Sequence, residues 1–426
     1  MILDDWIRQK HGIETEREGE IRCWQLKRIT ELIRRAKSES PYYRRLYDDT
    51  AVPDSWDAFR CLPFTDASAV REQGLQMLCV PQGEIERVVT LTTTGTSGLP
   101  KRLYFTRQDQ DLTIDFFYHG MALVARPGGV TVVFLPYERV GSVGDLLLKG
   151  LTRMHTKGIG YGLITELEDA VNVLMTNRAD SFVAAPVQAL ALACYVREHG
   201  IRLFLHKILL STDHLSGSVK KRLEADLQCE VYDHFGITEA GLGAAIDCPA
   251  HCGMHIREND LLFEVIHPES AEILPDGCSG ELVLTTLTRE GMPLIRYRTG
   301  DYGKIERKRC SCGSFLTRLW ASGGRIGNEI RHRDGMLTME DLDELLFAAE
   351  GLMDYRAGYQ YADNLLKLHL VFYAKLPGNM TEFIEMIQKV IREQTGLKTE
   401  ITAEPSMEIR PQYLQKRTIL RDGENE

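Results

Sequence analysis

Thr92-Thr93-Thr94-Gly95-Thr96-Ser97-Gly98-Leu99-Pro100-Lys101 is a stretch with the chemistry of a phosphate-binding loop. Its hydroxyl groups can donate hydrogen bonds, Gly95 and Gly98 let backbone N–H groups approach an anion, and Lys101 adds a positive charge. Residues 88–91 and 103–106 on either side are rich in β-branched and aromatic side chains, which predicts two strands. The Gly-Lys-Ser/Thr ending and following helix of a Walker loop are absent from the pattern. The alternative is a Gly/Thr hairpin that binds no ligand.

The composition is that of a folded globular protein. The chain has 426 residues, of which 43% are hydrophobic and 26% charged, and this length exceeds what one core usually supports, so we expect two domains. The net charge of −10 and the lack of a long basic run argue against nucleic acid as a partner. No apolar run approaches the roughly 20 residues of a membrane span, and the first residues do not form a secretory signal. A cytoplasmic enzyme is therefore expected.

Hydrophobic periodicity predicts the fold class. Residues 21–36 have helical spacing, and from residue 88 to about 286 helices alternate with short apolar strands, which predicts an α/β fold. The expected strands are residues 130–135, 181–185, 207–211, 260–266 and 281–286. A helix over 339–349, a strand over 366–372 and a helix over 380–395 then predict a small α+β unit. We therefore expect a large N-terminal domain over residues 1–326, with parallel or mixed sheets and flanking helices, and a small C-terminal domain over residues 327–426.

Three short motifs carry side chains suited to a nucleotide. In Phe235-Gly236-Ile237-Thr238-Glu239 a ring can stack on a base, a hydroxyl can reach phosphate and a carboxylate can hold Mg²⁺. Thr299-Gly300-Asp301 ends in a carboxylate on a glycine turn after a strand, and such a group can accept hydrogen bonds from a ribose. Arg325, after Gly323-Gly324, offers a guanidinium to phosphate or ribose oxygens. The plain alternatives are a turn, a turn-capping aspartate and a solvated arginine.

Four of the ten cysteines gather in two short segments, Cys248-Pro249-Ala250-His251-Cys252-Gly253-Met254-His255 and Cys310-Ser311-Cys312-Gly313. One ligand pair from each segment would complete a tetrahedral Zn²⁺ site, and four protein ligands would make that site structural. Arg309 would favour the thiolate form of the neighbouring Cys310. The residues alone leave open which of Cys248, Cys252, His251 and His255 bind the metal. The alternative is four free thiols on loops.

The order of these motifs resembles the acyl-adenylate-forming superfamily, and within it the phenylacetate–CoA ligase branch. The resemblance extends over most of the chain and depends on residues 93–101, 235–239, 299–301 and 324–325. Gly291-Met292-Pro293-Leu294-Ile295-Arg296-Tyr297-Arg298-Thr299-Gly300-Asp301 is especially similar to that branch, as are residues 253–256 and 310–313. The resemblance implies an AMP-forming ligase that uses ATP and Mg²⁺ to convert an aryl or related carboxylic acid to an acyl-adenylate, and then transfers the acyl group to coenzyme A.

The resemblance also implies a role for each site residue. Thr93, Thr94, Gly95, Thr96, Ser97 and Gly98 would hold the β- and γ-phosphates together with Lys101. Phe235 and Gly236 would flank adenine, Asp301 would bind ribose, and Asp213 and Arg325 would complete the nucleotide site. Thr238 would contact the α-phosphate and Glu239 would hold Mg²⁺. The zinc ligands would be Cys248, His255, Cys310 and Cys312. The C-terminal domain would be mobile and rotate about a hinge near Gly327 between the two steps.

The C-terminal motif departs from the family. Pro411-Gln412-Tyr413-Leu414-Gln415-Lys416 keeps the proline and the lysine but lacks the glycine, and Lys416 is the expected adenylation lysine. Two alternatives stay open: an adenylating enzyme that passes the acyl group to an amine or a carrier, and a nucleotide-binding homologue without turnover. The implied partners are a small carboxylic acid, ATP and CoA, without nucleic acid or a membrane span, and a homodimer stays open.

Overall fold

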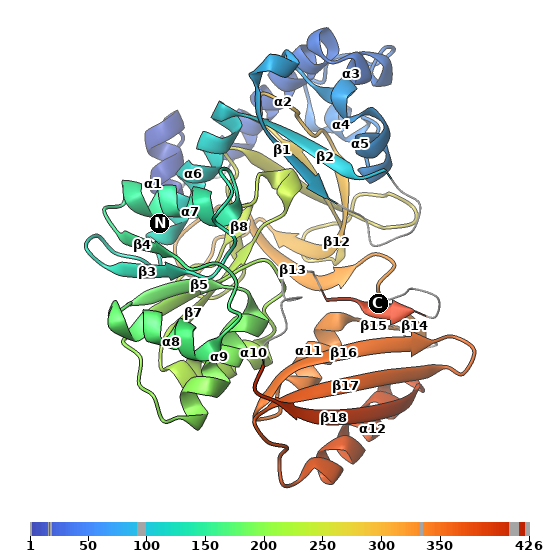
Figure 1. Cartoon of the computed structure of the whole chain (residues 1–426). Coiled ribbons are helices and arrows are strands. Elements are labelled where there is room, and N and C mark those ends of the chain that lie inside the picture. Colours follow the sequence, from blue (N-terminus) through green and yellow to red (C-terminus); the bar gives the residue numbers. More distant parts are fainter. Residues whose placement is uncertain are drawn as a thin grey trace. The chain divides into compact units, whose positions relative to one another are not determined.

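The computed structural model describes residues 2–15, 17, 19–91, 99–332, 335–408 and 417–421. These residues form two compact units, each assembled from separate segments of the chain (Figure 1). The first comprises Met1–Leu123, Arg139–Met154 and His234–Ala321, and the second comprises Val124–Glu138, His155–Asp233 and Ser322–Glu426. Among the described residues, no helix is both long and apolar enough to cross a membrane.

The first unit begins with helices. They are α1 (Ile2–His11), α2 (Glu20–Glu39), α3 (Pro41–Leu46), α4 (Trp56–Arg60) and α5 (Ala67–Gln73), followed by the short 3-10 helices η1 (Gly74–Met77) and η2 (Gln82–Glu84). The apolar stripe predicted over residues 21–36 is the buried face of α2, where Ile29 and Ile33 are fully buried. It packs in one core with Tyr43, Phe59 and Tyr297, so distant parts of the sequence stabilise this layer together.

The strands predicted beside the glycine-rich stretch form an antiparallel hairpin, β1 (Ile85–Leu91) and β2 (Lys101–Thr106). Helix α6 (Arg107–Met121) follows at once, because Thr106 and Asp109 form a capping box that satisfies backbone N–H groups at its start. Asp109 also accepts hydrogen bonds from the backbone N–H groups of Glu290 at 2.8 Å and Gly291 at 3.1 Å. These bonds join α6 to the segment before β12, and α7 (Val143–Arg153) packs against α6.

The remaining strands of the first unit lie in the order β8-β9-β13-β12-β11-β10. Their bounds are β8 (Ala245–Ile246), β9 (Met254–Ile256), β10 (Leu261–Ile266), β11 (Gly280–Thr286), β12 (Tyr297–Glu306) and β13 (Arg318–Arg325), the last of which continues into the second unit. The register of β11 with β12 shifts between Glu281 and Val283, opposite Gly300, whose φ is 74°. Thr299-Gly300-Asp301 therefore forms a bulge inside β12, and the prediction of a turn after a strand is wrong.

The second unit contains the parallel section predicted from the alternation of helices and strands. Its strand order is β4-β3-β5-β6-β7, and every neighbouring pair is parallel. The bounds are β3 (Val130–Val133), β4 (Lys157–Gly160), β5 (Ser181–Ala184), β6 (Lys207–Leu210) and β7 (Glu230–Phe235), with α8 (Leu167–Thr176), α9 (Pro186–Glu198) and α10 (Gly217–Leu227) as the helical connections. Three predicted strands are present and end one or two residues early. The last two residues of β7, His234 and Phe235, belong to the first unit.

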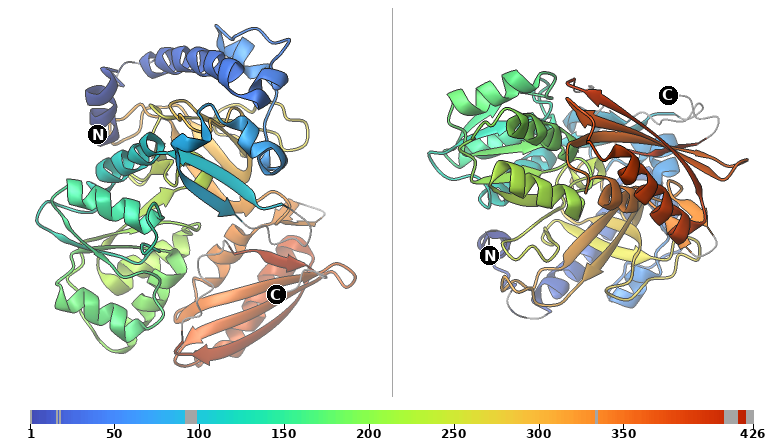
Figure 2. Two further views of the ribbon diagram at one scale, coloured as in Figure 1. Left: turned by 45° about the horizontal axis from the view of Figure 1, so that its top comes forward. Right: turned by 90° about the horizontal axis from the view of Figure 1, so that it is seen from below.

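The C-terminal part is the small α+β domain that the sequence predicted. It contains β14 (Ile330–His332), β15 (Gly335–Leu337), α11 (Met339–Leu346), β16 (Leu352–Gln360), β17 (Leu365–Tyr373), α12 (Met380–Thr395), β18 (Lys398–Ser406) and β19 (Ile419–Arg421). Strands β16 to β19 form a four-stranded sheet in the order β18-β17-β16-β19, and α12 packs against β18 (Figures 1 and 2). Helix α12 has the predicted bounds, whereas β16, β18 and β19 were not predicted. The fold class is thus confirmed: an α/β protein with mixed sheets, flanking helices and a smaller C-terminal α+β domain.

Candidate nucleotide site and metal centre

Lys101, the first residue of β2, lies against Glu239 of the short 3-10 helix η3 (Thr238–Ala240). The Lys101 Nζ donates a hydrogen bond to the Glu239 carboxylate and lies 3.2 Å from the Tyr297 hydroxyl, which in turn is 3.3 Å from Glu239 Oε1. The Lys101 and Glu239 side chains are only 11% and 8% exposed, so water screens their attraction weakly. Two predicted motifs that are distant in the sequence therefore meet in one buried ion pair.

The turn between β7 and η3 depends on Gly236. A Cβ at this position would lie 1.9 Å from the Leu242 carbonyl oxygen, which no side chain can tolerate. The Leu242 N–H donates to the Ile237 carbonyl at 3.0 Å and closes the loop that follows. Phe235, just before the glycine, is buried with its ring edge-on to Phe263 at 6.3 Å. This crossing of backbones positions Thr238 and Glu239.

Asp301 is buried within the bulge of β12. Its N–H donates to the Thr299 hydroxyl at 3.1 Å, and that hydroxyl donates to the Leu282 carbonyl at 2.8 Å. The Gly300 N–H donates to Glu281 at 3.1 Å, and Arg298 donates to the same carboxylate at 2.8 Å. Side chains therefore replace the ladder hydrogen bonds that the bulge interrupts, and they hold the backbone at Asp301 in place.

Asp213 and Arg325 lie in the second unit. Asp213 accepts a hydrogen bond from Arg417 Nε at 3.1 Å, and Arg417 donates two more to Asp343 of α11 at 2.7 and 2.6 Å. Two carboxylates, those of Asp213 and Asp343, thus bind Arg417, which is the residue after Lys416. Arg325 is exposed at the end of β13, and its carbonyl accepts from the Asn328 N–H at 2.9 Å. Gly327 has a φ of 87° in this turn, a conformation that suits glycine.

Part of the predicted site falls outside the described residues. These residues are Thr93, Thr94, Gly95, Thr96, Ser97 and Gly98 of the glycine-rich loop, and Lys416.

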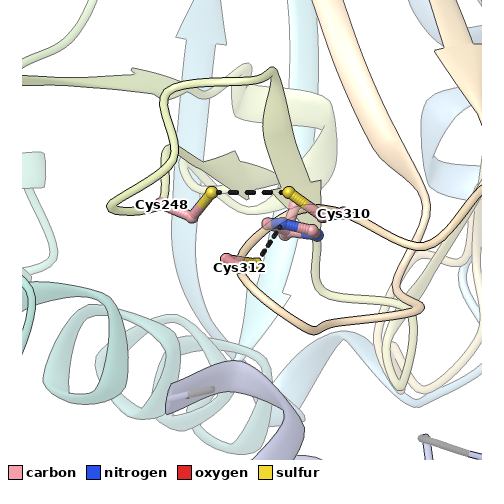
Figure 3. Close-up of side chains that lie close together, drawn as sticks. Cys248, Cys310 and Cys312 are labelled. Atoms are coloured by element: carbon pink, nitrogen blue, oxygen red, sulfur yellow. Dashed lines mark hydrogen bonds between the residues drawn. The ribbon is translucent and has the colours of Figure 1, made fainter.

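The four residues Cys248, His255, Cys310 and Cys312 come together in the first unit (Figure 3). Their ligand atoms all lie within 4.8 Å of one another, with 3.8 Å between the sulfurs of Cys248 and Cys310 and 3.4 Å between Cys312 Sγ and His255 Nε2. Tetrahedral Zn²⁺, with bonds of about 2.3 Å to sulfur and about 2.0 Å to nitrogen, requires ligand separations of about 3.5–3.8 Å. The Cys248–Cys310 separation lies in this range and the Cys312–His255 separation lies just below it, so both pairs are close to the spacing around one zinc ion, and the sulfurs are too far apart for a disulfide of about 2.05 Å.

Neighbouring groups orient the histidine for metal binding. The His255 Nδ1 donates to the Leu316 carbonyl at 3.1 Å, which leaves the Nε2 lone pair directed at Cys312. Burial lowers the pKa of His255 and favours the neutral imidazole, the form that binds metals. Gly253 has a φ of 90°, and a Cβ there would lie 2.7 Å from the Trp320 ring, so glycine is needed where the chain returns from Cys248 to β9.

The three thiols differ in acidity. Burial raises the pKa of Cys248 to about 12 and also raises that of Cys312. For Cys310 burial acts in the same direction, but hydrogen bonds from the backbone and side chain of Cys312 outweigh it and lower the pKa. The positive charge of Arg318 also favours the Cys310 thiolate, and Arg309, the neighbour of Cys310 in the sequence, donates to the Gly313 carbonyl at 3.4 Å.

His251 and Cys252 lie apart from the cluster. The His251 Nδ1 is 2.5 Å from the Asp247 carboxylate, and the exposed Cys252 thiol donates to the Ala250 carbonyl at 3.1 Å. Within the part of the chain that the structure describes, Cys248, His255, Cys310 and Cys312 are the group with metal-ligand geometry.

Three residues near the Lys101–Glu239 pair were missed by sequence reasoning. Tyr297 stands inside the string that carries the family resemblance, yet its hydrogen bonds with Lys101 and Glu239 depend on the fold. Arg257 and Arg289 are buried, and burial lowers the pKa of Arg289 to about 10 despite the nearby carboxylates of Asp109 and Glu239. No local pattern marks these two arginines, because their neighbours come from distant segments.

Comparison with solved structures defines the class of fold. A 2-hydroxyisobutyryl-CoA ligase in complex with 2-HIB-AMP superposes with a TM-score of 0.82 and 22% identity, over 98% of this chain and 92% of that one. The amide bond synthetase McbA from Marinactinospora thermotolerans has a TM-score of 0.56 and 14% identity, over 78% of this chain and 68% of that one. At these identities the likeness defines the fold alone, which is that of the adenylate-forming CoA ligases.

Sequence comparison narrows the class. The chain is similar to the phenylacetate-coenzyme A ligase of Thermus thermophilus, with 29% identity over 328 residues that cover 74% of this chain and 72% of that protein. The phenylacetate-coenzyme A ligase of Aromatoleum evansii is 28% identical over 325 residues, covering 69% of this chain and 68% of that protein. No family model matches the chain. The predicted resemblance to the phenylacetate–CoA ligase branch is thus confirmed, by similarity in sequence to these ligases and by a fold shared with CoA ligases.

Proposed function

We propose that this chain is an AMP-forming acyl–CoA ligase. In the first step a carboxylate oxygen attacks the α-phosphorus of ATP and pyrophosphate leaves, giving acyl-AMP. In the second step the thiol of coenzyme A attacks the acyl carbonyl, loses its proton and displaces AMP. Both steps depend on positioning and on stabilising negative charge, for which a site of donors, cations and one metal ion suffices.

The observation that carries this proposal is the buried Lys101–Glu239 pair. Lys101 emerges from a loop with phosphate-binding chemistry, and Glu239 has the oxygen ligands that Mg²⁺ prefers. We infer that Lys101 turns to phosphate and Glu239 to the metal when Mg–ATP binds, each exchanging one opposite charge for another. The site then needs no large desolvation of an unpaired charge, which would otherwise oppose binding.

The other roles in the nucleotide site are part of the same proposal. Phe235 and Gly236 would border the base, Asp301 would accept from the ribose, and Thr238 would donate to the α-phosphate. Thr93, Thr94, Gly95, Thr96, Ser97 and Gly98 would bind the outer phosphates, with Asp213 and Arg325 completing the site. Lys416 would stabilise charge in adenylation and belongs to the C-terminal domain that we propose to rotate about Gly327. Bound Mg²⁺ would supply positive charge at the phosphates.

The sequence likeness to phenylacetate-coenzyme A ligases supports an aryl or related acid as substrate and coenzyme A as acceptor. Free cysteines throughout, with no disulfide among the described residues, fit a reducing cytoplasm as the place of this activity.

The first experiment is pyrophosphate release with ATP and Mg²⁺ across a panel of aryl and fatty acids, with and without coenzyme A. Turnover with one acid class and CoA-dependent release of AMP are the expected results. Pyrophosphate release that CoA leaves unchanged would favour an amine or carrier as acceptor. No pyrophosphate release with any acid of the panel, in protein that still binds ATP, would contradict the proposed activity and favour a non-catalytic homologue.

We further propose that Cys248, His255, Cys310 and Cys312 hold a structural Zn²⁺. The two measured donor separations and the orientation of His255 support this, and four protein ligands leave no position for substrate. Elemental analysis of the freshly purified protein should find about one zinc per chain, because three thiols and one imidazole are the ligands that zinc favours. Metal content close to zero would sink this proposal without affecting the proposed ligase activity.

A further inference from the structure

A cavity of about 390 Å³ lies in the first unit, between the helices α2 and α4 and the strands β10 and β12. Its apolar lining includes Trp56, Phe59, Leu262 and Ile305, and its lining also contains three arginines, Arg22, Arg60 and Arg307. Neither Lys101 nor Glu239 lines it, so it is separate from the proposed nucleotide site. The volume is within the range of about 300–1,000 Å³ that is usual for small-molecule sites.

The charges around the cavity are unevenly compensated. Its two carboxylates already have partners: Glu264 binds the buried Arg296 through two nitrogens at 3.1 Å, and Asp276 forms an ion pair with Arg307. The other two arginines of the lining, Arg22 and Arg60, pair with neither of these carboxylates.

Arg22 lies over the Trp56 ring at 3.4 Å from its centroid, and among the described residues no carboxylate lies within ion-pair distance of it. Arg60 is 3.6 Å from Asp57, whose side chain is 95% exposed, and such surface pairs are weak. Burial lowers the pKa of Arg22 to about 10, and the positive charge of Arg307 adds to this effect. The guanidinium of Arg22 therefore lines the cavity with donors that no described carboxylate uses.

We propose that this cavity is a second ligand site, for a small organic monoanion that carries a carboxylate on an apolar body. Because Glu264 pairs with Arg296 and Asp276 with Arg307, neither carboxylate of the lining pairs with Arg22 or Arg60, and a ligand carboxylate could accept hydrogen bonds from these two arginines. A guanidinium presents paired N–H donors that match the two oxygens of a carboxylate. The body of the ligand would replace water against the apolar lining, with Trp56 as its largest surface.

The test uses 2-naphthoate as the probe and neutral 2-naphthamide as its isostere, titrated into the full-length protein by calorimetry. Arg22→Gln and Arg60→Gln each remove one positive charge of the lining. Arg34→Gln is the matched control, because Arg34 is an exposed arginine of the same helix as Arg22 and does not line the cavity. A substrate pocket that also binds naphthoate contributes equally to all four proteins, so the differences between them report on the cavity.

We expect wild type and Arg34→Gln to share a naphthoate site whose affinity falls at least about tenfold in Arg22→Gln and in Arg60→Gln, the usual effect of losing a charge-assisted hydrogen bond. Naphthamide should bind the cavity weakly and should not distinguish the variants. Equal naphthoate stoichiometry and affinity in all four proteins would overturn the proposal. If Arg22→Gln lowers the melting temperature, Arg60→Gln still decides the outcome, because Arg60 is an exposed side chain.

Discussion

The two candidate sites of the first unit are both buried, but they are built in opposite ways. At Cys248, His255, Cys310 and Cys312 the donor atoms converge within 4.8 Å, and the set is complete for one metal ion. Lys101 and Glu239, in contrast, neutralise each other. We expect the first arrangement to be stabilised by an ion at its centre, whereas in the second the two charges already stabilise each other and would have to separate before either could act on a ligand. A site of the first kind is expected to govern stability, and a site of the second kind to govern activity.

The largest expected effect concerns the metal centre. Cys310→Ser should remove the zinc and lower the free energy of unfolding by on the order of 5 kcal/mol, since structural zinc contributes about 10–16 kcal/mol in zinc-finger peptides. Elemental analysis and denaturant unfolding measure the two effects. Cys252→Ser is the matched control, because this thiol is exposed and outside the cluster. Equal unfolding curves for the two variants would contradict a structural role.

The next effect concerns the ion pair. Lys101→Met should lower kcat/KM for pyrophosphate release by about 10²–10³-fold, the usual loss when a charge-stabilising donor is removed. It should also destabilise the fold by about 3 kcal/mol, because Glu239 is left buried without its cation.

A second substitution separates these two losses. Lys101→Met with Glu239→Gln should regain most of the stability, because no uncompensated charge remains, but none of the activity. Denaturant unfolding and pyrophosphate release on the same preparations give both readouts. A double variant that is less stable than either single variant would show that the pair matters for its shape and not for its charges.

A smaller effect should appear in the pH dependence. Burial lowers the pKa of His234, which lies beside the rings of Phe116 and Phe117, to about 4 in the folded protein. The unfolded chain, with an ordinary histidine pKa of about 6.5, binds a proton that the folded chain excludes, so stability falls as pH drops through this window. Between pH 7 and pH 4.5 this histidine should cost about 2 kcal/mol.

The measurement is the free energy of unfolding of wild type and His234→Gln across this pH range. Loss of metal at low pH affects both proteins equally, so the difference in slope isolates His234. Parallel curves would mean that His234 is protonated in the folded state as readily as in the unfolded chain.

The smallest effect concerns Tyr297. Tyr297→Phe removes a hydroxyl that is 3.2 Å from Lys101 and 3.3 Å from Glu239, while the ring keeps its place in the core. We expect a loss of about 1 kcal/mol in stability, the usual worth of one hydrogen bond, and a change in activity below about tenfold. A loss as large as that of Lys101→Met would place the tyrosine hydroxyl among the groups that bind substrate.

The sequence predicted those features that depend on local pattern. The apolar repeat of residues 380–395 predicted α12 with its observed bounds, and the apolar runs at 181–185 and 207–211 predicted two parallel strands almost completely. Strand β18 was missed because its sequence is polar and has a proline near its end. Strand β16 was missed because its sequence contains a glycine, a residue that is uncommon inside strands. Such strands are stabilised by their neighbours in the sheet, which local propensity does not describe.

Candidate residues were predicted one at a time, whereas their partners depend on the fold. Lys101 and Glu239 were each identified from a motif, but their ion pair joins β2 to η3. Asp213 was assigned to the nucleotide, and its contacts with Arg417 come from the far end of the chain. The sequence did not predict the surroundings of Arg22, because the sequence of a helix does not show whether the fold brings a carboxylate within ion-pair distance of one of its arginines.

Gly236 has a consequence for anyone who builds variant libraries of this protein. With a Leu242 carbonyl oxygen 1.9 Å from the place of a Cβ, every substitution at this position must displace the chain, whatever its chemistry. A screen for activity would therefore score position 236 as intolerant even if the glycine never touched a nucleotide. Position 238, where the threonine is half-buried and follows the crossing, is the better reporter of ligand contact. Two positions in one motif would thus fail in a screen for unrelated reasons, one because of backbone geometry and one because of chemistry.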